Sequence, residues 1–156
     1  MLSIGCISGC LLGGGGPTLA LRHTTAGTGL AVGFDADLGM GLSTSPDITS
    51  IVGGGGGFEK PFLSGSGSQD LIGYGYFQAL VGDDRFARLA IGAMNAASDP
   101  GVHIMFAGSV GLAHPAFFSK CRGAAPSIEV GVRITAGAFE IFATPRAYVY
   151  DGSFCD

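Results

Sequence analysis

The stretch GLAVGFDADLGMGLS, residues 29–43, alternates between two kinds of side chain and decides the class of fold. Every second position from Leu30 to Leu42 is apolar, while the positions between them carry only glycine, alanine, serine or aspartate. A repeat of two residues places successive side chains on opposite faces of a β-strand. We therefore predict a strand with one apolar face and one small or acidic face, the latter including Asp35 and Asp37.

The composition of the whole chain favours strands of this kind over other classes of protein. Apolar residues make up 47% and charged residues 13% of the 156 residues, whereas charged residues make up about 25% of a typical soluble domain. The apolar runs are all shorter than the roughly 18–20 residues of a membrane-spanning helix. A net charge of −4 argues against a nucleic-acid partner, which requires a basic surface. We predict an all-β domain.

The alternation recurs along the chain and predicts eight strands joined in sequence order. Strands of this number and length favour a closed, antiparallel, up-and-down barrel over a sandwich, since closure leaves no free edge. Pro145 requires a bulge or an edge in the last strand, because proline lacks an N–H for the ladder. The predicted strands are residues 18–24, 29–43, 48–58, 71–81, 86–96, 102–113, 128–136 and 140–150.

The charged residues of these strands fall on the faces that otherwise carry glycine, alanine, serine and threonine. If those faces met water, they would offer about one charge per strand, which is too few for a soluble surface. We predict the reverse, with aliphatic side chains towards lipid and paired charges in a narrow lumen. The predicted lumen residues are Arg22, Asp35, Asp37, Arg88, Glu129, Arg133, Glu140 and Arg146.

Over residues 18–150 this pattern resembles the small outer-membrane β-barrels of Gram-negative bacteria. The resemblance implies a lipid bilayer as partner, no cofactor, no enzymatic activity, and a structural, anchoring or adhesive role. Bulk transport is not expected, because side chains fill the interior of an eight-stranded barrel. One departure is the C-terminus, where Tyr150 is followed by DGSFCD instead of ending on an aromatic strand residue.

A second interpretation turns the same barrel inside out. It is a periplasmic, lipid-tethered soluble barrel that binds a small apolar ligand in an aliphatic cavity. The two interpretations differ in the position of Leu30, Val32, Phe34, Ile104 and Phe106, which lie outside in the first and line a pocket in the second. A third, a hydrolase using Asp35 or Asp37 as catalytic carboxylates, is disfavoured because four arginines on the same face are expected to pair with them.

Residues 1–16 are predicted to lie outside the barrel domain, which covers 17–156. Within them, Ile7-Ser8-Gly9-Cys10 resembles the lipobox of bacterial lipoproteins, which implies lipidation of Cys10, with the following glycines as a tether. The charged n-region of a signal peptide is missing, and the alternative is a frayed apolar tail.

The up-and-down order brings the loop after the sixth strand to the same side as both termini. Cys121 and Cys155 are therefore candidates for a disulfide, which the periplasm permits. The cysteines and histidines lack the spacing of a metal site. The tyrosines Tyr74, Tyr76, Tyr148 and Tyr150 either form an interfacial aromatic girdle or pack inside the barrel.

Overall fold

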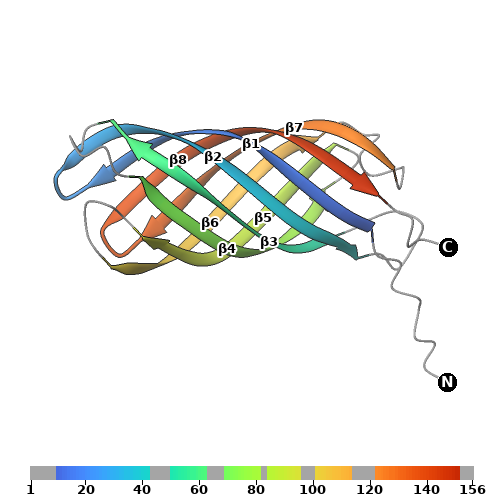
Figure 1. The fold of residues 1–156 in the computed structure, drawn as a ribbon, viewed down its shortest axis with the longest axis horizontal. Coiled ribbons are helices and arrows are strands. Elements are labelled where there is room, and N and C mark those ends of the chain that lie inside the picture. The colour runs from blue at the N-terminus through green and yellow to red at the C-terminus, as the bar shows by residue number, and fades with distance from the viewer. Residues whose placement is uncertain are drawn as a thin grey trace, which may run out of the picture.

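The computed structural model describes residues 10–42, 50–62, 69–81, 84–95, 101–113 and 122–151. Each strand pairs antiparallel with the next, and β8 pairs with β1, so the sheet closes into a barrel (Figure 1). The fold predicted from the alternation, an eight-stranded up-and-down barrel, is confirmed. The strands are β1 (Cys10–Thr24), β2 (Gly27–Leu42), β3 (Ser50–Pro61), β4 (Asp70–Val81), β5 (Arg85–Asn95), β6 (Val102–Ala113), β7 (Arg122–Thr135) and β8 (Ala138–Asp151).

The chain termini distinguish one end of the barrel from the other. Both chain termini emerge at one end, which we call the termini end (Figure 1). The connections from β1 to β2 and from β7 to β8 lie at the opposite end, which we call the turn end. In the part of the chain that the structure describes, no helix is long and apolar enough to cross a membrane.

β1, β3 and β7 extend furthest beyond their predicted ends. Residues 10–16, expected to be a tether, are the first half of β1, so the predicted domain boundary after residue 16 is wrong. β3 continues past its predicted end at residue 58 to Pro61, and β7 begins at Arg122 within a predicted loop. Glycine is needed in β1 because the barrel is narrow there: a Cβ at Gly14 would overlap the ring of Tyr148 on β8.

Pro145 lies neither at a bulge nor at an edge. On one side it pairs with Ile128 of β7. On the other side the β1–β8 ladder is interrupted between the pairs Gly15–Ala147 and Leu19–Ala143, with the same register before and after. Within this gap the hydroxyl groups of Thr18 and Thr144 are 3.1 Å apart and hydrogen-bonded. A side-chain bond thus joins the two strands where proline interrupts the backbone ladder.

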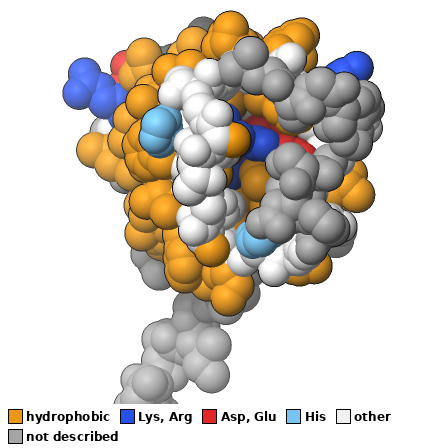
Figure 2. Space-filling view, turned by 90° about the vertical axis from the view of Figure 1, so that its left-hand side faces the viewer, with side chains coloured by type: hydrophobic (Ala, Val, Ile, Leu, Met, Phe, Trp, Pro, Cys, Tyr) orange, Lys and Arg blue, Asp and Glu red, His pale blue; other side chains and the backbone are white. Residues whose placement is uncertain are grey.

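The aliphatic side chains lie on the outer wall of the barrel, and the charged ones lie in its lumen. The five residues that discriminate between the two interpretations are 38–64% exposed. Viewed from the turn end, basic and acidic side chains are visible at the centre of a largely hydrophobic rim (Figure 2). The aliphatic pocket required by the second interpretation is therefore not formed by Leu30, Val32, Phe34, Ile104 and Phe106.

The strands are long enough for the wall to match a bilayer. β3, β4 and β6 each have 12 residues. Twelve residues at about 3.3 Å each cross roughly 28 Å when a strand is tilted by about 45°. The hydrocarbon core of a bilayer is about 30 Å thick.

The described tyrosines face the lumen, so the girdle interpretation is wrong for them. Tyr76 and Tyr148 are buried, and Tyr74 donates a hydrogen bond to a lumen aspartate. The side chain of Tyr150 is outside the described part of the chain. Tyr76 and Tyr148 belong to an apolar cluster that fills the lumen near the termini end, together with Leu12, Ile51, Phe86, Ala113 and Ala125.

Candidate functional site: two rings of charge in the lumen

The first site is a closed ring of alternating charges near the turn end, which we call the outer ring. Glu59 accepts from Arg22 Nη2 at 2.9 Å and from Arg133 Nη1 at 2.7 Å. Glu140 accepts from Arg22 Nε at 2.7 Å and from Arg133 Nη1 at 2.8 Å. Each carboxylate thus bridges both guanidinium groups. Asp70 adds a further ion pair to Nη1 of Arg22.

A second ring, the inner ring, lies deeper in the lumen. Arg88 Nη1 and Arg146 Nη1 are 2.9 and 3.0 Å from Oδ2 of Asp37. On the other side, Arg146 Nε and Arg88 Nη1 are 2.9 and 3.6 Å from Oε2 of Glu129. Asp35 stands beside this ring, with its Oδ1 2.6 Å from Arg146 Nη1. The rings have the same plan: two arginines, two bridging carboxylates and one additional carboxylate.

Uncharged polar groups complete the inner ring. Gln78 Oε1 accepts from Arg88 Nε at 3.0 Å and from Nη2 at 2.7 Å, and Nη2 also donates to the hydroxyl of Tyr148. The hydroxyl of Tyr74 donates to Asp35 Oδ1 at 2.6 Å. These contacts fix the guanidinium group of Arg88 and one oxygen of Asp35, so the arrangement is preorganised.

The structure places all eight residues predicted for the lumen in or beside these rings, and all are buried. Sequence reasoning missed Glu59, Asp70 and Gln78. The predicted third strand ends at residue 58, one position before Glu59, and the predicted fourth strand begins at residue 71, one position after Asp70. Counting inward positions every second residue from Ile51 would have placed Glu59 in the lumen, and counting back from Ile72 would have placed Asp70 there.

Carboxylates outnumber arginines among the described lumen residues. Six carboxylates and four guanidinium groups are buried there. Each ring is balanced by itself, so Asp70 and Asp35 are the excess acids. Removing an acid should therefore be tolerated far better than removing an arginine, because a buried charge without a partner is costly.

We expect Asp35→Asn to change the free energy of unfolding by less than about 1 kcal/mol. The amide keeps an oxygen for Tyr74 and Arg146 and removes one negative charge from a lumen with an excess of acids. The urea midpoint of the full-length barrel in detergent micelles measures this. A loss of several kcal/mol would show that Asp35 is required for charge balance and would contradict this description of the lumen.

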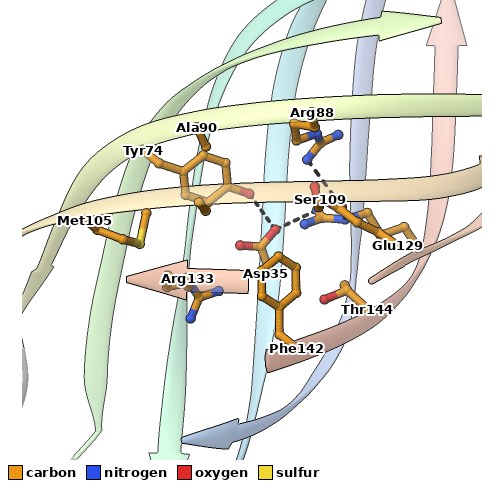
Figure 3. Close-up of a pocket in the computed structure, with 12 residues that line it drawn as sticks. Asp35, Tyr74, Arg88, Ala90, Met105, Ser109, Glu129, Arg133, Phe142 and Thr144 are labelled. Carbon is orange, nitrogen blue, oxygen red and sulfur yellow. Dashed lines mark hydrogen bonds and ion pairs between the residues drawn. The ribbon is translucent and has the colours of Figure 1, made fainter. Parts of the chain in front are cut away.

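A small cavity of about 20 Å³ lies beside Asp35, lined by polar groups of both signs (Figure 3). Tyr74 and Ser109 point towards it, and Arg133 lies on its other side. Such a volume has room for a single water molecule bonded to these groups. Asp35 and Asp37, the pair considered for hydrolysis, are both held by arginines.

The structure does not describe the side chains of the three cysteines predicted to be modified or paired. Cys121 and Cys155 lie outside the described residues, as does the side chain of Cys10. Across the described ranges, no three side chains of histidine, cysteine, aspartate or glutamate are grouped to hold a metal ion. The disulfide and the lipidation remain predictions.

Comparison with known proteins found no relative of this chain. The chain matches no protein-family model, no curated protein and no solved structure.

Proposed function

We propose that the chain spans a lipid bilayer as a small outer-membrane β-barrel with a structural, anchoring or adhesive role. The observation that carries this proposal is the apolar outer wall around a charged lumen. Leu89 and Leu38 are 69% and 65% exposed, and large aliphatic or phenylalanine side chains are exposed on all eight strands. Soluble monomers rarely expose contiguous apolar patches above a few hundred Å².

The lumen supports a structural role over transport. Two charge rings and the apolar cluster fill most of it, and the cavity between the rings has room for about one water molecule. Bulk passage of solute would require these ion pairs to separate. The filled lumen therefore supports a structural, anchoring or adhesive role over transport.

A tryptophan reporter tests the membrane proposal, because the sequence contains no tryptophan. We expect Phe106→Trp, which places the indole on the outer wall, to be quenched strongly by phospholipids with brominated acyl chains in vesicles. Acrylamide in the aqueous phase should quench it weakly. Phe142→Trp, at a buried lumen position, is the matched inward control and should respond little to brominated lipid.

The competing soluble barrel predicts a different result. The full-length chain would refold to a monodisperse β-protein in plain buffer, and Phe106→Trp would be quenched by acrylamide and not by brominated lipid. That outcome would reject a membrane-spanning role. Folding that requires micelles or vesicles supports it.

A further inference from the structure

A groove crosses the outer wall over β4 to β7 and ends near an exposed arginine. Its floor is made of small outward side chains, Ala79, Ala87 and Gly108, and larger apolar residues such as Leu89 and Val110 form its sides. Its volume is about 490 Å³. The surface is apolar along its length, so a hydrocarbon chain could lie in it with close contact on both sides.

The groove begins near the termini end and runs towards the middle of the wall. Ala87 is the third residue of β5, and Ala79 is paired with it on β4. Gly108 lies near the middle of β6 and pairs with Leu89. In a barrel that spans a bilayer, this is the direction of an acyl chain that starts at the surface and ends near the midplane.

Arg85 stands at the outer end of this groove. It is the outward neighbour of Ala87 on β5, about 7 Å along the strand. Its side chain is 70% exposed, and its Nε is 3.5 Å from Asp84 Oδ1, an exposed ion pair of the weak kind. In the part of the chain that the structure describes, no carboxylate is paired with its two terminal nitrogens, which suit a phosphate oxygen pair.

We propose that this groove and Arg85 form a binding site for one anionic phospholipid. The phosphate would contact Arg85 at the rim, and one acyl chain would lie over Ala79, Ala87 and Gly108. This inference rests on the proposed membrane-spanning function and adds a lipid class to it. The negative phosphate complements the positive charge of Arg85. The groove determines where the acyl chain lies.

Single tryptophans report the lipid at the site and away from it. Val110→Trp lies on the side of the groove, and Leu38→Trp lies on β2, on another part of the wall. The full-length variants are reconstituted in vesicles of phosphatidylcholine and phosphatidylglycerol at fixed proportions, with bromine on one lipid or the other. At Val110→Trp we expect an apparent preference for phosphatidylglycerol of about fivefold, and no preference at Leu38→Trp.

Two further changes in the Val110→Trp background identify the contacts. Arg85→Gln should abolish the preference by removing the phosphate contact. Gly108→Leu should also abolish it by filling the groove, since a Cβ there meets Leu89 Cδ2 at an ordinary 3.7 Å. Gly73→Leu is the matched control: a Cβ there meets nothing within 4 Å, and Gly73 does not line the groove, so the preference should be retained.

Equal quenching by the two lipids at Val110→Trp would overturn the proposal, as would a preference that survives Arg85→Gln. Those results would leave the membrane-spanning role intact. Absence of quenching by either brominated lipid at both tryptophans would instead reject the membrane-spanning role itself. The two failures are therefore distinguishable.

Discussion

Replacing Arg133 with leucine is expected to lower the free energy of unfolding by about 3–5 kcal/mol. Arg133 Nη1 is within 2.8 Å of both Glu59 and Glu140, and all three side chains are buried. Without it, Arg22 alone faces Glu59, Glu140 and Asp70. Leucine has no donor for these oxygens, and the excess of negative charge in the outer ring increases.

Urea unfolding of the full-length chain in micelles measures this loss. Lys60→Leu, which removes an exposed positive charge from the outer wall, is the matched control and should change stability little. Adding Glu140→Gln to Arg133→Leu should recover part of the loss, because it removes one of the carboxylates left without a partner. An unchanged midpoint for Arg133→Leu would mean that the outer ring does not stabilise the barrel.

Replacing Gly92 with alanine is expected to destabilise the barrel by about 3 kcal/mol, because the new methyl group has no space. Gly92 faces the lumen on β5, and a Cβ there would overlap the carbonyl oxygen of Gly73 and lie 2.7 Å from Tyr74 Cα. Both are backbone atoms of β4, so a rotamer change cannot relieve the contact. The neighbouring strand would have to move.

Gly73→Ala is the control for Gly92→Ala, since Gly73 faces outwards on the adjacent strand with nothing within 4 Å of its Cβ position. Alanine there should stabilise the strand by about 0.5–1 kcal/mol, because glycine loses more conformational freedom on folding. Both variants are compared by urea unfolding and by the content of β-structure. Equal effects of the two substitutions would contradict the close approach of β4 and β5 on the lumen side.

The alternation of residues predicted the fold, and the small number of charges on one face of the strands predicted which face points inwards. In residues 29–43 the alternation separated Asp35 and Asp37 from the aliphatic side chains, and a two-residue period permits no other grouping. It failed where the sequence has no contrast. The glycines of residues 13–16 look like a tether, yet in a narrow barrel they are the residues that fit opposite Tyr148 and neighbouring carbonyl groups.

The ring geometry could not be predicted, although its charged members could. Glu140 meets its direct ladder partners, Arg22 and Arg133. The other contacts depend on the tilt of the strands, which brings together residues distant in the ladder. Arg22 on β1 meets Glu59 and Asp70, on β3 and β4, across the lumen. Ion pairs of this kind join strands that share no backbone hydrogen bonds, and no local pattern specifies them.

Because the number of strands is even, the chain leaves the barrel on the side from which it entered (Figure 1). If the barrel spans a bilayer as proposed, anything joined covalently to either end, whether an acyl group, a tag or another polypeptide, would therefore share one compartment. The other compartment would meet the barrel only through the connections between strands. Attachment through the ends and recognition by the connections at the turn end would thus be physically separated by the full height of the wall.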